Sequence, residues 1–508
     1  MKLLYSLILL TVFTSCQKEK SWHDKIILAD DQVTMVASID LLGIVNKMDV
    51  SKSELPIDQK IMLNGILSSL DSDILGFKLE GSHRFFLVPE EGERNGGVFV
   101  SGDVVELEKF KSTIKSTFGG IQISDGEVDV FYAEEFNLTI GYNAKNFIAG
   151  ISLDKEFTVS KIESYFKTSN SNEISDSSIE TYLERKDDFS YFLSADKLLM
   201  AVEKMNIPFF SIQDLPIPNV NSFVALNFND GDIVLESEIL SVDNASNPSI
   251  SGNGLDEKFT RFLTDNDELI GFVLANLNTD EIVNQIDNLS DQKEISRINR
   301  NLKRFNVTLN DLVNMFDGQL SFSLINLPFK PQNDNYDDWN DDEWEEDVNT
   351  PKAPKIILNA GLSNQLAFSD FLNKAELKIV QNEIFSDKGM NLLIKDNVFH
   401  LSTEFDLLEK ISTTNELGSY SMIDNDLINE PIYFELNTNL DYFPREIINA
   451  IDEEDGEIAM KELFEEIERV YFHGNGTKSS MNVVFTDKNK NGLAQLIDII
   501  SKRLAVLA

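Results

Sequence analysis

A run of oxygen-bearing side chains near the C-terminus has residue types and a spacing suited to calcium. Asp487, Asn489 and Asn491 alternate along the chain before Gly492, and Asp498 stands at the twelfth place of the run. Calcium binds carboxylate, amide and carbonyl oxygens, and loops with this spacing supply them. Asp487, Asn489, Asn491 and Asp498 are therefore candidate metal ligands, and calcium is the one cofactor that the sequence indicates.

A second interpretation of the same run is a polar turn between a strand and a helix. Apolar residues already follow a helical period from the seventh place, where a calcium loop is still non-helical: Leu493, Leu496, Ile497, Ile500 and Leu504. The twelfth place also carries Asp instead of the usual Glu. The turn is the favoured interpretation, and it predicts a helix that starts near Gly492.

No pattern in the sequence indicates catalysis. The four histidines are not spaced as zinc ligands: His23, His83, His400 and His473. The sequence has no Gly-x-Ser-x-Gly turn, no phosphate-binding Walker loop and no dinucleotide-binding glycine pattern. Pairs of carboxylates are uninformative, because 86 Asp and Glu residues produce many by chance. No catalytic residue is assigned, and a non-enzymatic role is favoured.

An acidic run with two tryptophans interrupts the C-terminal part of the chain. It extends from Asn333 to Asp347, inside an expected insert over residues 331–350, and it contains Trp339 and Trp344. So many carboxylates cannot pack in a core, and the insert is expected in solvent. Trp339 and Trp344 are candidate partner-binding residues. A loop that is only solvated is the favoured alternative.

Cys16 is the single cysteine, and it follows a segment with the features of a signal peptide. Lys2 gives a positive start, and Leu3 to Phe13 are mostly apolar. Such a stretch is too short to span a bilayer. The sequence Phe13-Thr14-Ser15-Cys16 resembles the lipobox of bacterial lipoproteins. That resemblance implies removal of residues 1–15, acylation of Cys16 and attachment to a membrane through lipid.

The residues after this cysteine, Gln17-Lys18-Glu19-Lys20, resemble in part the Lys-acidic signal that directs some Bacteroidetes-type lipoproteins to the cell surface. We therefore expect an outer-membrane protein, held by lipid on the cell surface or on the periplasmic face. Residues 16–25 are expected to form a tether. Because the mature chain has no second cysteine, intramolecular disulfides are excluded.

The 508-residue chain carries 86 acidic and 44 basic residues, which gives a formal net charge of −42. Such a charge repels phosphate backbones and argues against nucleic acid as a partner. The hydrophobic fraction of 42% is sufficient for globular cores. The length suggests more than one domain.

Six elements recur in the same order in two parts of the chain, which indicates an ancient internal duplication. The counterparts are strand-to-helix segments (33–47 and 269–284), helices before a turn (63–77 and 309–322), strand–turn–helix segments (97–114 and 355–377), hairpins (128–151 and 390–403), strands (189–199 and 431–440) and final hairpins (221–240 and 468–485). The halves are expected over residues 26–245 and 256–508, joined by a linker at 246–255 that is rich in small polar residues.

The strands of this sequence alternate in polarity, for example over residues 223–228, which is typical of antiparallel sheets with one face in solvent. Helices are expected between the groups of strands. We therefore predict an α+β fold with two similar halves, each a mostly antiparallel sheet with helices packed on one face.

The order of elements, the two-part layout and the lipoprotein start resemble a family of large Bacteroidetes-type lipoproteins that share a domain of unknown function. The nearest motifs are the strand-to-helix turn Ala37-Ser-Ile-Asp40 and the strand Gly97-Val-Phe-Val100. The resemblance covers nearly the whole mature chain. It implies no activity and no catalytic residue.

Three functions agree with these features. The favoured one is a non-enzymatic, lipid-anchored cell-envelope protein that binds or scaffolds a protein or a glycan through a sheet face or the acidic insert. The first alternative is a hydrolase that acts on glycan or peptide with an Asp/Glu pair. The second is a structural envelope protein that calcium stabilises.

Overall fold

The structure, a computed structural model, describes most of the chain from residue 21 onward. The described ranges are 21–89 and 96–197 with gaps, 220–241, 251–325 and 355–418 with gaps, 430–439, 443 and 464–507. The expected signal peptide, Cys16 and the acidic insert with Trp339 and Trp344 lie outside the described residues.

The chain forms two compact units. Unit 1 comprises Met1–Asn46, Lys60–Leu226 and Ile239–Asp243, and unit 2 comprises Lys47–Gln59, Asn227–Glu238 and Asn244–Ala508. The sequence placed residues 227–238 in the first half. They belong to unit 2 because Asp232 to Glu238 pair with a strand from the C-terminal part of the chain.

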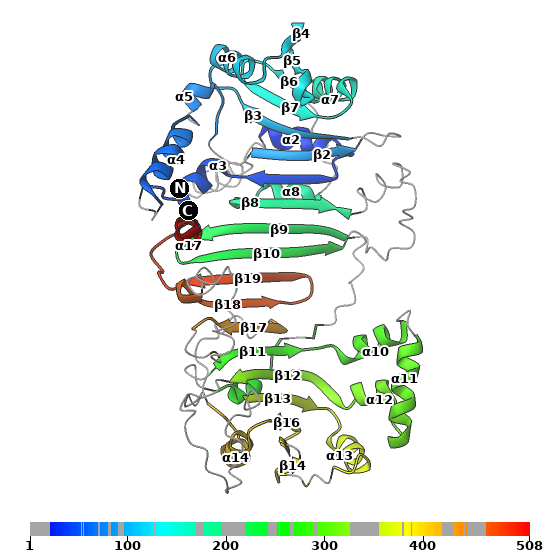
Figure 1. Ribbon diagram of the computed structural model, residues 1–508. Helices are drawn as coiled ribbons and strands as arrows, with labels where there is room; N and C mark the ends of the chain where they lie inside the picture. Colours follow the sequence, from blue (N-terminus) through cyan, green and yellow to red (C-terminus); the bar gives the residue numbers. More distant parts are fainter. Residues whose placement is uncertain are drawn as a thin grey trace, which may run out of the picture. The chain divides into compact units, whose positions relative to one another are not determined.

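Unit 1 contains an antiparallel sheet in which β1 (Met35–Ile39) is an inner strand (Figure 1). Neighbouring strands pair in the order β4–β5–β6–β7–β3–β2–β1–β8–β9. Their bounds are β2 (His83–Pro89), β3 (Gly96–Asp103), β4 (Ile121–Asp125), β5 (Asp129–Ala133), β6 (Leu138–Tyr142), β7 (Asn146–Ile151), β8 (Phe189–Ser194) and β9 (Val220–Asn229).

The strands of unit 2 are also paired antiparallel, and β11 (Leu269–Asn276) holds the place that β1 holds in unit 1. The pairing order is β14–β15–β16–β13–β12–β11–β17–β18–β19–β10. The bounds are β10 (Asp232–Ser241), β12 (Phe316–Ile325), β13 (Lys355–Leu362), β14 (Phe385–Asp387), β15 (Met390–Lys395), β16 (Val398–Ser402), β17 (Ile432–Asn437), β18 (Ile467–Gly474) and β19 (Lys478–Phe485).

The strands of the two units have the same connectivity. The order β5–β6–β7–β3–β2–β1–β8–β9 in unit 1 corresponds, strand by strand along the sequence, to β14–β15–β16–β13–β12–β11–β17–β18 in unit 2. The predicted α+β class with antiparallel sheets is confirmed. The repeated connectivity is what two similar halves would produce.

Helices join these strands and cover parts of the sheets (Figure 1). Their bounds are α2 (Trp22–Ala29), α3 (Leu41–Lys47), α4 (Ile57–Ser69), α5 (Ser72–Leu75), α6 (Leu107–Phe118), α7 (Lys155–Thr168), α8 (Ser177–Leu183), α10 (Thr279–Asn288), α11 (Gln292–Leu302), α12 (Leu309–Val313), α13 (Gln365–Lys374), α14 (Phe405–Thr414) and α17 (Gly492–Leu507). Short 3₁₀ helices are η1 (Glu134–Phe136), η3 (Glu257–Phe262) and η5 (Lys303–Phe305).

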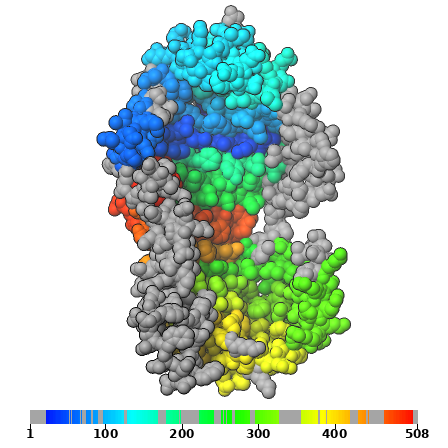
Figure 2. Space-filling model, viewed as in Figure 1, coloured from blue at the N-terminus to red at the C-terminus, as the bar shows by residue number. Residues whose placement is uncertain are grey.

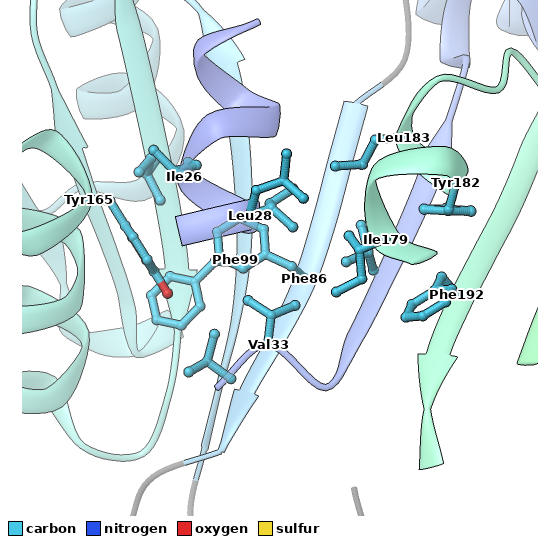
Figure 3. Close-up of a cluster of buried hydrophobic side chains, with 14 of the residues drawn as sticks. Ile26, Leu28, Val33, Phe86, Phe99, Tyr165, Ile179, Tyr182, Leu183 and Phe192 are labelled. Carbon is cyan, nitrogen blue, oxygen red and sulfur yellow. The ribbon is translucent and has the colours of Figure 1, made fainter. Parts of the chain in front are cut away.

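The main core of unit 1 lies between one face of its sheet and the helices α2, α7 and α8. Figure 3 shows Phe86 and Phe99 of the sheet beside Ile26, Tyr165 and neighbouring side chains from these helices. The rings of Phe86 and Phe99 stack with their centroids 5.5 Å apart. Helix α2 begins at Trp22, so the first residues of this core element lie inside the range 16–25 that the sequence assigned to a tether.

A smaller core occupies the opposite face of the same sheet. Phe110 and Ile114 of α6 pack there against β5, β6 and β7. Ile148 belongs to the main core, whereas its neighbours Phe147 and Ala149 pack in the smaller one, because successive side chains of a strand point to opposite faces. Unit 1 therefore has the expected helical layer on one face and a second, partial layer on the other.

Unit 2 repeats this arrangement. Its main core joins β11, β13 and β17 to η3 and α14, whereas α13 packs on the opposite face near β15 and β16. The sheet extends beyond α13, over β12, β11, β17, β18, β19 and β10. This stretch carries the interaction surface described below.

A capping box starts helix α12 in unit 2. The hydroxyl of Thr308 accepts a hydrogen bond from the backbone N–H of Asp311, and the Asp311 carboxylate accepts one from the backbone N–H of Thr308. The Thr308 hydroxyl also donates to the Asp311 carboxylate at 2.7 Å, and this bond, followed by the one from the Thr308 backbone N–H, holds the pKa of Asp311 below its ordinary value.

Replacing Thr308 by Ala is expected to lower the free energy of unfolding of unit 2 by about 1 kcal/mol, because one helix-terminal N–H loses its acceptor. Denaturant unfolding measures this change. Ser412→Ala is the control, because the Ser412 hydroxyl is exposed and bonds only to a carbonyl one turn earlier. Equal stability of the two variants would contradict the assigned cap.

Candidate interaction surface

The run from Asp487 to Asp498 forms the polar turn that the sequence favoured. Helix α17 begins at Gly492, directly after the turn. Asp487 accepts a hydrogen bond from the backbone N–H of Asn489 at 2.9 Å, and Asn491 accepts one from Leu493 at 3.0 Å. These side-chain oxygens thus bond to amides of the chain itself and fix the start of the helix.

Asp498 lies within α17 and is 3% exposed. Its carboxylate forms an ion pair with the ammonium of Lys490. A cation of the chain therefore already neutralises this carboxylate. In the part of the chain that the structure describes, no group of three or more His, Cys, Asp and Glu side chains is arranged to hold a metal ion.

Adding calcium or EDTA is accordingly expected to shift the melting temperature by less than about 1 °C, because a ligand stabilises a fold only when it binds the native state. Asp498→Asn is expected to lower the stability of unit 2 by about 1–3 kcal/mol, because a buried charge-assisted bond to Lys490 is lost. Calorimetry of both proteins with each additive measures these effects. A rise of several degrees with calcium that Asp498→Asn abolishes would show that the run binds the ion.

Three of the four histidines occupy ordinary structural places. His23 of α2 bonds through Nε2 to Oδ1 of Asp103 at 2.9 Å, and this bond lowers the pKa of Asp103. Burial lowers the pKa of His83 and of His473. His473 lies on β18 opposite Tyr433 and Ser480.

His400 belongs to a buried polar row in unit 2. Its Nδ1 lies 2.7 Å from Oδ1 of Asn359, and the Asn359 amide donates to the hydroxyl of Ser321 at 2.8 Å. The Phe262 ring contacts the imidazole edge-on, with centroids 4.8 Å apart. Burial, together with the charge of Lys395, lowers the pKa of His400 to about 3, so the imidazole is neutral at physiological pH.

The buried polar row and the helices that cover it lie on the same face of the sheet. Ser321, Asn359 and His400 are neighbours across β12, β13 and β16, and each is completely buried. They share this face with Leu274 and Leu393 of the main core of unit 2. The covered face of this sheet thus contains a hydrogen-bonded polar row beside apolar core residues.

The opposite face of the sheet is apolar over six adjacent strands. One row of register partners crosses β12, β11, β17, β18, β19 and β10: Phe322, Val273, Phe434, Phe472, Met481 and Leu235. The next row on the same face is Leu324, Gly271, Leu436, Val470, Val483 and Ile233. We call these twelve residues the apolar face of unit 2.

Large side chains of the apolar face are exposed. Phe322 and Phe434 are each 36% exposed, Leu235 is 40% exposed and Met481 is 41% exposed. Figure 2 shows β18 and β19 in orange and red, and β10 in green, at the surface of the molecule. Contiguous apolar surface of this kind on a soluble domain marks a binding site more often than single exposed apolar residues do.

The open face of this sheet is therefore more apolar than a face in solvent usually is. The sequence predicted one face in solvent, and that face carries Phe322, Phe434 and Met481, while Ser321, Asn359 and His400 lie among the apolar core residues of the covered face. A signal for the apolar face is present in the sequence. Ile432-Tyr433-Phe434 and Val470-Tyr471-Phe472 are apolar at consecutive positions, so both faces of β17 and β18 receive large apolar side chains.

Unit 1 carries a related surface on the corresponding strands. The row Val100, Phe85, Ala37, Tyr191 and Val224 crosses β3, β2, β1, β8 and β9, and the covered row beside it contains Ser101, Arg84, Ser38 and Ser190. The open residue Val98 is 48% exposed, and its β7 partner Ile151 is 54% exposed. Apolar side chains thus lie on the open face of the strands in both units.

Comparisons with known proteins do not assign this chain to a family. No protein-family model and no curated protein matches the chain. One solved structure, described as crystal form IV of TP0453, is similar with 9% sequence identity over 43% of this chain and 83% of that chain, at a TM-score of 0.26. A score this low supports no conclusion about fold or function.

None of the helices among the described residues is sufficiently long and apolar to cross a membrane. Cys16, Trp339 and Trp344 lie outside the described residues, so the lipid anchor and the partner-binding tryptophans stay predictions. The residues that sequence reasoning did not single out are those of the apolar face, above all Phe322, Phe434 and Met481.

Proposed function

We propose that this chain is a non-enzymatic, lipid-anchored protein of the cell envelope that binds a protein partner through the apolar face of unit 2. Acylated Cys16 holds the chain on the outer membrane in this proposal, either on the cell surface or on the periplasmic face. A glycan is the less favoured ligand, because sugar hydroxyls require polar partners that the apolar face does not offer.

One observation carries the proposal, namely the exposed apolar side chains on the open face of the sheet in unit 2. Leaving Phe322, Phe434 and Met481 in water costs free energy that polar residues at those positions would not cost. Covering each of these partly exposed side chains with a partner regains roughly 0.5–1 kcal/mol, a fraction of the gain for full burial. A partner that covers the face therefore explains why apolar residues are placed there.

Site-specific photocrosslinking in cells tests this function. A benzoylphenylalanine replaces Phe434 on the apolar face, and a matched protein carries it at Leu366, which is 83% exposed on α13. Both probes replace exposed apolar residues of unit 2 in the full acylated chain. We expect a discrete crosslinked protein from position 434 and none from position 366. Absence of a crosslink at position 434, or the same products at both positions, would refute the proposed docking.

A further inference from the structure

We propose that the partner presents an amphipathic helix with an apolar side and basic flanks to the apolar face of unit 2. This inference rests on the proposed function and adds the chemistry of the partner. Three properties of unit 2 support it: the way its strands are paired, the width of the apolar face, and the charges at the ends of its strands.

Recognition on this face takes place through side chains. The strands β12, β11, β17, β18 and β19 each have a hydrogen-bonded neighbour on both sides. Their backbone N–H and C=O groups are therefore used within the sheet, and an added strand has no place on these five. The partner must offer an apolar surface of its own.

The dimensions of the apolar face suit a helix. Neighbouring strands lie about 4.8 Å apart, so six strands are about 24 Å wide. A helix rises about 1.5 Å per residue, so a helix of about 16 residues has this length. One helical turn advances about 5.4 Å, close to the strand spacing, so each turn places an apolar side chain near a strand.

Acidic side chains flank the apolar face at the ends of its strands. Asp230, Asp232 and Asp487 lie where β10 begins and β19 ends. Asp317 and Glu430 lie at the other end, beside the starts of β12 and β17. These positions put negative charge on both sides of a helix that lies across the strands.

The basic residues nearest to the face are engaged in ion pairs. Lys478 pairs with Glu238 at 3.0 Å, Arg469 with Glu435 at 3.5 Å, Lys488 with Glu468, and Lys490 with Asp498. The positive charge around the face is thus matched by carboxylates, and the flanking acids leave an excess of negative charge. A partner with basic flanks complements this excess.

The same charge disfavours two other occupants. A second copy of the chain would bring another net charge of −42 against the first. An anionic lipid surface is repelled in the same way. A basic amphipathic helix combines attraction at the flanks with apolar contact at the centre, and it is the occupant that the surface selects.

Peptide binding to the chain from Gln17 to Ala508, which contains every described residue, tests this inference. The probe is an 18-residue helix of Leu and Lys with all Leu on one side, and its counterpart has Glu in place of Lys. We expect the Leu/Lys helix to bind at least about 10-fold more tightly than the Leu/Glu helix. Replacing Phe434 and Met481 by Thr should weaken the Leu/Lys helix at least about 10-fold, whereas Leu366→Thr should leave it unchanged. Replacing Asp230, Asp232 and Asp487 by Asn should reduce the preference for Lys.

Other outcomes overturn the inference. Equal binding of the two peptides would show that the face does not recognise basic amphipathic helices. Leu/Lys binding that is not weakened when Phe434 and Met481 are replaced by Thr would show the same. Binding to phosphatidylglycerol vesicles that is stronger than binding to the Leu/Lys helix would indicate a lipid surface as the occupant. Concentration-dependent dimers that disappear when Phe434 and Met481 are replaced by Thr would indicate a second copy of the chain. A crosslink from position 434 in cells together with a negative peptide result would refute only the partner class. Loss of both signals would refute the docking function as well.

Discussion

Replacing Phe434 and Met481 together by Lys is expected to abolish docking to the apolar face of unit 2, with a loss of affinity of at least about 100-fold. Both residues are register partners of Phe472 on β18, so the two Lys side chains would place charges in the middle of an uncharged row. A partner that covers these charges must remove water from them without offering an opposite charge, which costs several kcal/mol of binding free energy. A loss of about 2.7 kcal/mol already corresponds to a 100-fold loss of affinity.

The measurement is the yield of the photocrosslinked product from a probe placed at Phe322, a neighbouring position of the same face. Because Phe434 and Met481 are partly exposed, the variant is expected to fold, and its melting temperature checks this. Leu366→Lys with Phe405→Lys is the matched control, since both residues are exposed apolar side chains of α13 and α14. Phe434→Leu with Met481→Leu should retain the product. A full yield from the Lys pair would contradict the docking site.

Unit 2 is expected to lose stability steeply as the pH falls below about 6.5, at a rate of about 1.4 kcal/mol per pH unit from His400 alone. The pKa of His400 is about 3 in the folded chain and near 6.5 in an unfolded chain. Between these values the unfolded chain binds a proton that the folded chain does not bind. The free energy of unfolding therefore falls as the pH falls through this window, and the contribution of His400 is fully present above it.

Amide exchange of β13 and β16 at pH 7 and pH 4.5 measures this loss within unit 2. The comparison is made with His400→Gln, whose amide keeps a polar group near Asn359 but does not titrate. The carboxylates of the chain titrate in both proteins, so their effect cancels in the difference. We expect the wild type to lose about 2–3 kcal/mol more than the variant between these two pH values. Parallel losses would mean that His400 is not kept neutral by burial.

The sequence was sufficient to predict the class of fold and the repeated order of elements. Short apolar runs such as those over 269–276 and 431–437 indicated strands, and the connectivity found in both units follows the order in which those segments recur. The helix after Gly492 was also predicted, because its apolar period begins at Leu493. These features depend on local patterns, which a single sequence contains.

The apolar face was not predicted, because the side of a strand that faces solvent is decided by which side the helices cover. In β17, Tyr433 and Phe434 are both large and apolar, and only the tertiary structure shows that Tyr433 is covered and Phe434 is open. In β13 and β16, polar Asn359 and His400 would be placed in solvent by polarity alone. They are buried with a hydrogen bond between Nδ1 of His400 and Oδ1 of Asn359.

The boundaries of the two units along the sequence also depend on long-range strand pairing. The segment Asp232–Glu238 follows directly from β9 in the sequence, and its pairing with Lys478 to Val484 joins residues about 250 positions apart. No local pattern contains such a contact. Helix α2 is a similar case, since it begins at Trp22 inside the expected tether, and its residues Ile26, Ile27 and Leu28 pack in the main core of unit 1.

Thiol protection in cells tests the central claim, that a partner covers the apolar face of unit 2, most directly. The chain has a single natural cysteine, so Phe434→Cys and the control Leu366→Cys each add one new thiol. Their rates of reaction with N-ethylmaleimide are compared between intact cells and the purified protein. The account predicts that Cys at position 434 reacts at least about 10-fold more slowly in cells, while Cys at position 366 reacts equally in both. Equal rates at position 434 in cells and in the purified protein would contradict it.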